Sequence, residues 1–557
     1  MPEQAATRRW LSSLAVHSRL LILATISAGV VVGLATIVQM VFLARIVHQG
    51  IVTEVPVEEL SLLFTGVVAA IVIRGVAQGL QARFAARCSR KVRSEVRHQI
   101  NRCWQATGPV AMGQISAGTL AREWLDHTDA LHGYFARFLP QMILAVIVPL
   151  LVLVVVFSLD WLAGIFLLLS APLIPLFMAL VGMGAEKLNQ QHFRTIGRLS
   201  GQFLDKVRGL TTLQLFGQTE PAAETLRQRS DEYRRVTMKT LRVAFLSSAV
   251  LEFFSSVAIA VVAIYIGFGL LGYISYGPAE DLTLFSGLLV LLLAPEFFQP
   301  LRLLSQHYHD RAAAIGAGSE IAARLQDADR AGPAAHRISQ QRQSPDRIAV
   351  QHLTLAYDAD RPVLDQVSLE IDRGDVIALT GPSGGGKSSL LYLLAGFMQP
   401  DQGSISIFGT APGEVAFGWL GQSPFLVHGT WADNLRLTTP DATDIAIETA
   451  LHQVGLGSLL RSRKRGIYSK ISEDGQGLSG GQARRLSLAR VFVADYDLIL
   501  LDEPTAGLDS DSEIYIIEAL RKLALAGKTL IFATHHQALL TLANRTLLVT
   551  AGGVHDA

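Results

Sequence analysis

The sequence GPSGGGKS at residues 381–388 decides the fold of the C-terminal part of the chain. It fits the pattern G-x-x-x-x-G-K-[ST], whose glycines allow backbone N–H groups to surround phosphate oxygens. The preceding run DVIALT (375–380) is short and apolar, as a buried parallel strand should be, and SLLYLLA (389–395) is typical of a helix. Strand, glycine loop and helix N-terminus together predict a phosphate-binding loop in an α/β domain.

This loop predicts a nucleotide site with named contacts. Lys387 is expected to reach the β- and γ-phosphates, and Ser388 to bind Mg²⁺. Tyr357 lies about two dozen residues earlier and could stack on a purine, although a strand aromatic packed in a core fits the same pattern. The predicted ATP-binding residues are Tyr357, Gly381, Pro382, Ser383, Gly384, Gly385, Gly386, Lys387, Ser388 and Ser389.

Two motifs further along the chain require the same nucleotide. The apolar run LILLDE (498–503) predicts a buried strand that ends in two carboxylates. Asp502 is expected to bind Mg²⁺ and Glu503 to polarise the attacking water, unless both are only solvated charges at a strand end. LSGGQ, at the start of a helical run, predicts a second anion-binding nest. Its residues are Leu478, Ser479, Gly480, Gly481 and Gln482.

The composition of the whole chain is too apolar for an ordinary soluble enzyme and predicts membrane spans. Of the 557 residues, 50% are hydrophobic and 17% are charged, and the net charge of +1 gives no field that favours nucleic acid. Six stretches of about 20 mostly apolar residues are long enough to cross a bilayer. These predicted spans are 20–47, 60–82, 138–157, 161–183, 243–271 and 282–303. Cys88 and Cys103 lie in a basic stretch that we assign to the cytoplasm, so we expect no disulfide framework.

Loop charge orients the spans. Basic residues crowd the segments after spans two and four, whereas the alternate loops are short and acidic, which predicts cytoplasmic termini. The basic segments are compatible with helix, so we expect helices that continue beyond the bilayer and turn near residues 118–120 and 209–211. The predicted parts are an interfacial N-terminal helix (1–18), a six-helix transmembrane domain (19–325), a linker (326–346) and an ABC-type nucleotide-binding domain (347–557).

The motif set, in this order and after six spans, resembles ABC transporter half-molecules of the exporter type. The resemblance covers nearly the whole chain and implies an α-helical membrane domain followed by an α/β P-loop ATPase domain. It implies that Gln422 is the Q-loop residue, Asp509 belongs to the D-loop, His535 contacts the γ-phosphate, and Glu473 touches the turns of the membrane domain. In this family, LSGGQ of one subunit faces the ATP bound to the other. The implied catalytic set is Glu503, His535 and Gln422, and the implied Mg²⁺ ligands are Ser388, Gln422 and Asp502.

Four membrane stretches carry a narrower resemblance. They are YFARFLPQM (134–142), PLIPLFMALVGMG (172–184), FLSSAVLEFF (245–254) and APEFFQPLR (294–302). They are similar to the CydD side of the CydDC family, bacterial exporters needed for cytochrome bd assembly. The resemblance implies an inner-membrane location, a CydC-like partner subunit, and a cargo of cysteine, glutathione or haem. The alternatives are a homodimeric exporter of lipids or drug-like molecules and an ATP-gated membrane regulator.

Polar residues inside the spans indicate where cargo binds. Arg74, Glu252 and Glu296 fall well inside predicted spans, and so do the uncharged polar residues Gln39 and Gln299. Such residues are costly in lipid and tend to face the bundle interior. A cavity with both signs of charge suits a zwitterion such as an amino acid or γ-glutamyl peptide. Interhelical ion pairs that only fix packing fit the same pattern. We expect no axial haem ligand here, because no histidine falls at mid-membrane.

Overall fold

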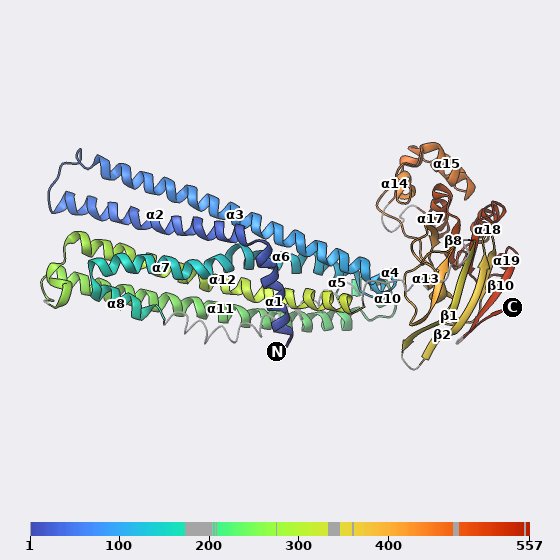
Figure 1. Ribbon diagram of the computed structural model, residues 1–557, viewed down its shortest axis with the longest axis horizontal. Helices are drawn as coiled ribbons and strands as arrows, with labels where there is room; N and C mark the ends of the chain where they lie inside the picture. Colours follow the sequence, from blue (N-terminus) through green and yellow to red (C-terminus); the bar gives the residue numbers. More distant parts are fainter. Residues whose placement is uncertain are drawn as a thin grey trace. The chain divides into compact units, whose positions relative to one another are not determined.

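The computed structural model describes residues 2–172, 203, 206–207, 209–274, 276–331, 346–358, 361–471, 478–550 and 553–557. The chain divides into two compact units (Figure 1). The first is Met1–Thr107 with Ile115–Ala331, and the second is Gly108–Gln114 with Gly332–Ala557. In the described residues, the first unit is helical and the second contains every strand.

The first unit is a bundle of long helices. In chain order its helices are α1 (Pro2–His17), α2 (Arg19–Ile51), α3 (Ser61–Thr107), α5 (Ala117–Arg122), η1 (Glu123–His127), α6 (Thr128–Gly133), η2 (Tyr134–Phe138), α7 (Leu139–Leu159), α8 (Trp161–Ser170), α10 (Leu210–Leu215), α11 (Thr219–Leu270), η3 (Gly277–Asp281) and α12 (Leu284–Ala331). Among the described residues, five helical segments are long and apolar enough to cross a membrane. The predicted fourth span, 161–183, begins as the apolar helix α8 and then leaves the described residues.

Several helices are much longer than a bilayer requires. α3 has 47 residues, α11 has 52 and α12 has 48. At a rise of 1.5 Å per residue these helices extend roughly 70 Å or more, against about 30 Å of hydrocarbon. The predicted continuation of the spans as helices is therefore confirmed. α12 runs to Ala331, into the segment predicted as a linker, and residues 332–345 lie outside the described part.

The predicted turn at residues 118–120 is wrong. α3 already ends at Thr107, and Gly108 adopts φ +79° before Pro109 opens the short helix α4 (Pro109–Gly113). The Ser116 side chain then caps α5, so residues 118–120 are helical. The break follows from the Gly-Pro pair, because glycine accepts the left-handed backbone and proline favours a first helical position.

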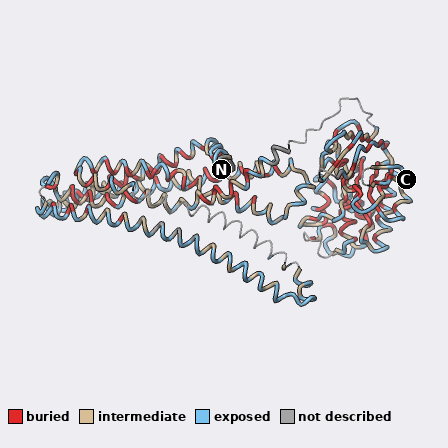
Figure 2. Tube along the Cα trace, turned by 90° about the horizontal axis from the view of Figure 1, so that it is seen from below, coloured by how far each residue is buried: buried red, intermediate tan, exposed pale blue. Residues whose placement is uncertain are grey.

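Two apolar clusters hold the first unit together. One contains Phe297 and Phe298 of α12 and side chains from α2, α7, α8 and α11. The other joins Leu11 and Leu14 of α1 to α2, α3, η2 and α12, so the N-terminal helix is packed rather than free. The first half of α11 is mostly exposed (Figure 2).

The second unit is an α/β domain. Its strands are β1 (Arg347–Asp358), β2 (Arg361–Asp372), β3 (Val376–Thr380), β4 (Gln402–Ile407), β5 (Phe417–Leu420), β6 (Gly429–Thr430), β7 (Lys470–Ile471), β8 (Leu498–Asp502), β9 (Thr529–Ala533), β10 (Arg545–Thr550) and β11 (Gly553–Asp556). The main sheet has the order β11-β10-β3-β9-β8-β5, and all its pairs are parallel except β10-β11. A second, antiparallel sheet has the order β2-β1-β4, and β6 pairs with β7.

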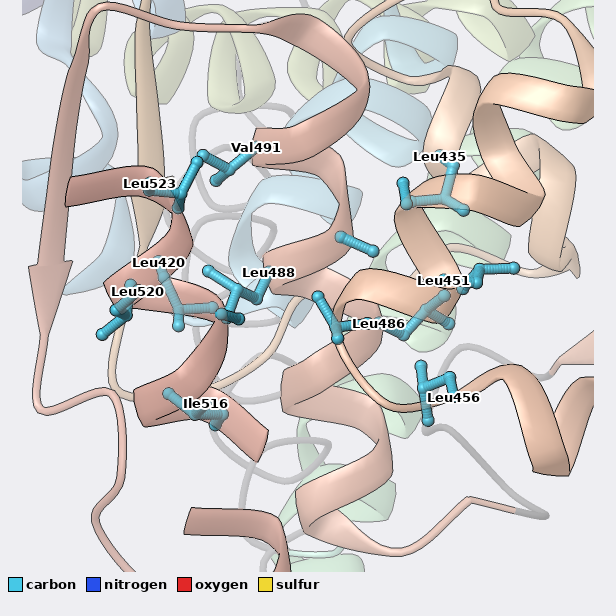
Figure 3. Close-up of a cluster of buried hydrophobic side chains, with 14 of the residues drawn as sticks. Leu420, Leu435, Leu451, Leu456, Leu486, Leu488, Val491, Ile516, Leu520 and Leu523 are labelled. Carbon is cyan, nitrogen blue, oxygen red and sulfur yellow. The ribbon is translucent and has the colours of Figure 1, made fainter. Parts of the chain in front are cut away.

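The antiparallel sheet and α13 cover one face of the main sheet, and helices cover the other face. The helices that follow β3 are α13 (Lys387–Leu394), α14 (Trp431–Arg436), α15 (Asp444–Gln453), α16 (Gly457–Ser462), η4 (Gly466–Tyr468), α17 (Gly480–Ala494), α18 (Ser510–Leu525) and α19 (Gln537–Leu540). β8 and β9 are buried along their whole length, as apolar central strands of a parallel sheet should be. Figure 3 shows α17 side chains Leu486 and Leu488 in one cluster with Leu451 and Ile516.

Candidate functional site

Three neighbouring strands of the main sheet end at one edge. β3 leads into the glycine loop, β8 ends at Asp502, and β9 leads to His535. The strands are in register, because Ala533 pairs with both Leu379 and Asp502. Ligands of open α/β sheets bind at the carboxyl ends of the strands, so this edge is the expected site.

The glycine loop wraps tightly around the start of α13. Gly381 has φ +135°, and a Cβ there would collide with the carbonyl oxygen of Val549, so only glycine fits. The Lys387 ammonium donates to the carbonyl oxygens of Gly381 (2.8 Å) and Pro382 (3.0 Å). Burial lowers the pKa of Lys387, against the opposing influence of nearby carboxylates. The first N–H groups of α13 have no intrahelical partner, so loop and helix form an anion site.

A hydroxyl and a buried carboxylate meet beside this loop. Ser388 Oγ donates to Asp502 Oδ1 at 3.1 Å. Asp502 is only 1% exposed, and its Oδ2 has no hydrogen-bond partner among the described residues. Burial raises the pKa of the Asp502 carboxyl, although the Ser388 hydrogen bond and the Lys387 charge oppose the shift. Oxygen ligands of this kind suit Mg²⁺, and the unpartnered oxygen fits a metal ligand.

A second carboxylate faces a histidine at the same edge. Glu503 Oε1 lies 3.8 Å from His535 Nε2, and both side chains are partly exposed. Glu503 has φ +50°, and its N–H donates to the Ala533 carbonyl oxygen, which fixes the backbone beyond β8. The adjacent His536 instead contacts Glu513, with Nδ1 3.2 Å from Oε1. The two histidines therefore have different partners, and only His535 lies against the predicted catalytic acid.

Arg484 of α17 connects the loops around the site, and sequence reasoning gave it no role. Its guanidinium donates to the carbonyl oxygens of Gln422, Glu503 (3.3 Å) and Ala506 (2.6 Å). Arg484 is buried, and its burial lowers its pKa. The Gln422 side chain itself is exposed, so this contact fixes its backbone. Two adjacent arginines at the start of a largely buried helix were the available signal.

The predicted second nest begins α17. Ser479 and Gln482 form a capping box, in which the Ser479 Oγ accepts from the Gln482 N–H (3.2 Å) and the Gln482 Oε1 accepts from the Ser479 N–H (3.0 Å). Gly480 has open space around it, whereas Gly481 packs closely on Ser512. Asp509 caps α18 through Ser512, which holds the pKa of that carboxyl below its usual range. Leu478 packs on the core, and Glu473 lies outside the described residues.

Tyr357 projects from β1 near the phosphate loop. Its hydroxyl is 3.1 Å from Ser389 Oγ and 3.5 Å from Met398 Sδ. The residue is 53% exposed. The ring is therefore not a core aromatic, and its exposed surface is free to stack on a flat ligand.

The first unit contains a cavity of about 380 Å³ between α2, α3, α7 and α12. Three of the predicted cargo residues, Arg74, Glu296 and Gln299, line it. Glu252 does not: its carboxylate is paired with Arg302 at 3.3 Å, which links α11 to α12. Glu252 is therefore not placed with the other three residues, and its countercharge lies on a neighbouring helix.

Further glutamines line the same cavity, and sequence reasoning did not identify them. Gln78 and Gln81 follow Arg74 on α3 at positions i+4 and i+7, which is one helix face. Gln141 of α7 is buried, and its amide donates to the Pro300 carbonyl oxygen at 2.9 Å. The helical spacing from Arg74 was the signal that could have found the first two.

Comparisons with known proteins agree with both units. Residues 21–295 match the ABC transporter transmembrane region family, and residues 364–506 match the ABC transporter family. The chain is 38% identical to the glutathione/L-cysteine transport system ATP-binding/permease protein CydD of Escherichia coli K12, over 96% of this chain and 91% of that protein. It is also 38% identical to the transport ATP-binding protein AarD of Providencia stuartii (95% and 90%).

A further relative and a solved structure match as well. The chain is 32% identical to the CydC protein of the same kind of transport system in Bacillus subtilis, over 82% of this chain and 79% of that protein. The structure of a bacterial Atm1-family ABC exporter with ATP bound superposes with a TM-score of 0.76 at 19% identity, covering 98% of this chain and 94% of that one. At that identity the match establishes the fold alone.

Proposed function

Because this chain belongs to the ABC transporters, as an exporter subunit of the CydD type, we propose that it exports a reduced thiol, cysteine or glutathione, as one half of a heterodimer. It is a multi-pass membrane protein whose ATPase domain powers transport. We place it in the bacterial inner membrane with both termini in the cytoplasm, and we assign its transport to cytochrome bd assembly. The observation that carries the cargo proposal is the cavity containing Arg74 and Glu296.

The residues at the sheet edge are suited to in-line attack of water on a γ-phosphate. Glu503 orients and polarises the water, while Lys387 and the loop N–H groups stabilise the charge that spreads over the phosphate oxygens. His535, next to Glu503, reaches the same phosphate. Ser388, Asp502 and Gln422 would hold Mg²⁺, which neutralises charge on the β- and γ-phosphates when bound.

The cavity suits a small zwitterion. Its volume of about 380 Å³ lies within the usual range for small-molecule sites, about 300–1,000 Å³. Arg74 would bind a carboxylate and Glu296 an ammonium group, and the glutamines would bind peptide-like amides.

Haem is the less favoured cargo. No histidine or cysteine is among the described residues that line the cavity. Two histidines elsewhere in the bundle already have partners, because His132 contacts Ser89 Oγ (2.8 Å) and His307 contacts Asp310 (3.5 Å).

The composite ATP site of the family and an exposed helix tip support the proposal of a second subunit. In the family, the LSGGQ nest of one subunit acts on the ATP of the other, so neither site is complete alone. At the end of α10, Leu215 is 80% exposed and Phe216 is 74% exposed. Adjacent exposed apolar side chains at a turn indicate a contact surface, and we assign it to a CydC-like partner.

One experiment tests the cargo proposal directly. The full-length chain is purified with its partner, and ATPase activity is measured with cysteine, glutathione and haem. We expect the thiols to stimulate ATPase, and Arg74→Gln to abolish the stimulation. Arg45→Gln is the matched control, because Arg45 is also a span arginine but stacks on Phe285 (5.8 Å) and does not line the cavity. Stimulation that survives in R74Q, or that only haem produces, would refute the thiol assignment. Full activity of the chain without a partner would favour a homodimer.

A further inference from the structure

A second cavity, of about 470 Å³, lies where α1 meets α3. Its lining is strongly basic: Arg87, Arg90 and Lys91 come from α3, against the single acid Glu95. His17, the last residue of α1, and Ser18 complete the wall between α1 and the start of α2.

The described residues do not neutralise the positive charge in this cavity. Arg87 and Arg90 are exposed and make no ion pair or hydrogen bond among the described residues. Lys91 donates to the His17 carbonyl oxygen at 2.9 Å, which caps α1 but supplies no full negative charge. By contrast, the nearby Arg93 and Arg97 both contact Asp129, at 2.6 and 3.3 Å.

The only acid in the lining is already engaged. Glu95 Oε1 accepts from the Gln99 amide at 3.0 Å and lies 3.7 Å from Arg102. Two free guanidiniums and an ammonium therefore face a hollow that contains no available countercharge, and such a site is complementary to an anion.

The position of the cavity identifies the source of the anion. It opens at Ser18, immediately before α2, whose apolar sequence forms the first membrane span. The first apolar residues of that span are exposed, Leu20 to 76% and Leu23 to 56%. Side chains exposed at this point contact acyl chains in a bilayer, so the basic residues lie at headgroup depth. α1 lies across the bundle at this end of α2 (Figure 1), as an interfacial helix does.

We propose that the α1–α3 cavity binds the headgroup of an anionic phospholipid, with the phosphodiester on Arg87, Arg90 and Lys91 and the acyl chains along Leu20 and Leu23. This lipid fixes α1 to the end of the first span. The site is separate from the ATP site and from the cargo cavity, and its occupancy does not depend on which thiol is transported.

The test uses the full-length chain with its partner, stripped of lipid in detergent and analysed by native mass spectrometry. We expect one phosphatidylglycerol to bind tightly at the site, while phosphatidylcholine binds at least tenfold more weakly. Arg87→Gln with Arg90→Gln should weaken phosphatidylglycerol binding by about 30-fold, since each basic residue near an anionic lipid surface contributes about fivefold. Both side chains are exposed, so the melting temperature should not change.

A charge-matched control separates a site from bulk attraction. Arg229→Gln with Arg235→Gln removes the same charge from exposed positions of α11 outside the cavity, and it should change binding by less than twofold. The proposal is overturned if R87Q/R90Q binds phosphatidylglycerol as the wild type does, or if both double variants weaken it equally. It is also overturned if inorganic phosphate displaces phosphatidylglycerol and binds with the same affinity as the lipid, because the ligand is then a free anion.

Discussion

Replacing Arg484 with methionine should slow ATP hydrolysis far more than it weakens ATP binding. The guanidinium joins three loops by donating to the carbonyl oxygens of Gln422, Glu503 and Ala506. Hydrogen bonds to charged groups contribute about 1.5–3 kcal/mol each but are not additive, so we expect a loss of about 3 kcal/mol in the free energy of unfolding. For a domain of this size that lowers the melting temperature by about 6–12 °C.

The effect on catalysis comes from displacement of the loop that carries Glu503 rather than from lost stability. A displacement of about 1 Å at the catalytic loop lowers kcat by about 100-fold. The KM for ATP should change less than threefold, because Lys387 and the loop at 381–386 make no hydrogen bond with Arg484 in the described part of the chain. Arg484→Lys should restore part of the rate, since it keeps the charge and some donors.

The assay is steady-state phosphate release by the full-length protein at a temperature where every variant is folded. Arg490→Met is the matched control: Arg490 is on the same helix and donates to Asn434 Oδ1 (3.1 Å) and to the Asn434 carbonyl (2.9 Å), away from the ATP site. It should lower the melting temperature with little change in kcat. If R484M slows turnover no more than R490M, or raises KM in proportion, Arg484 does not position the catalytic loop.

Three further changes test other parts of the structure. Glu503→Gln should reduce ATP hydrolysis at least 100-fold while equilibrium nucleotide binding is retained, and unchanged phosphate release would remove Glu503 from the catalytic role. The Thr430 N–H and hydroxyl hold the pKa of Asp433 below its usual range, so this carboxylate stabilises α14 at neutral pH and stops doing so as the pH falls through its lowered pKa. Asp433→Asn should therefore lower the free energy of unfolding by about 0.3–1 kcal/mol at pH 7 and leave it unchanged in strong acid, as measured by melting curves across pH. Asp160→Ala should lower the free energy of unfolding by about 2–4 kcal/mol, because the buried Asp160 caps α8 and accepts from the Tyr265 hydroxyl at 2.9 Å. Asp160→Asn keeps an acceptor, so its melting temperature should be close to that of the wild type.

The sequence predicts the strands and the glycine loop at the candidate ATP-binding edge well, because its signals are local. The spacing within GPSGGGKS and the apolar run before Asp502 fix a strand, a loop and a helix start, and a parallel sheet then places the strand ends together. Arg484 could not be assigned in the same way. Its three partners lie 19 to 62 residues away in the chain, and only the folded domain brings their carbonyl groups to one guanidinium.

Turns in the membrane unit were harder to place than spans. Span positions follow from about 20 apolar residues, and the described helices agree with them. The end of α3 depends instead on Gly108 and Pro109, a short signal inside a long polar helix, and the glycine at 118 competes with it. Hydropathy carries no information about such a break, because the helix there is outside the apolar windows.

The charged side chains inside the spans show most clearly what the structure adds to the sequence. Hydropathy gives the depth of Arg74, Glu252 and Glu296 in their spans but not the direction in which each side chain faces. The structure separates them: Glu252 pairs with Arg302 at 3.3 Å, whereas Arg74 and Glu296 line one cavity with no ion pair between them among the described residues. An ion pair inside a bundle is satisfied and needs no ligand, whereas Arg74 and Glu296 line one cavity without forming an ion pair, so each can bind a charged group of a ligand. A molecule that carries both an ammonium and a carboxylate group supplies both countercharges at once, and a lipid tail or a neutral drug supplies neither. This difference is the physical reason to prefer a zwitterionic thiol as cargo.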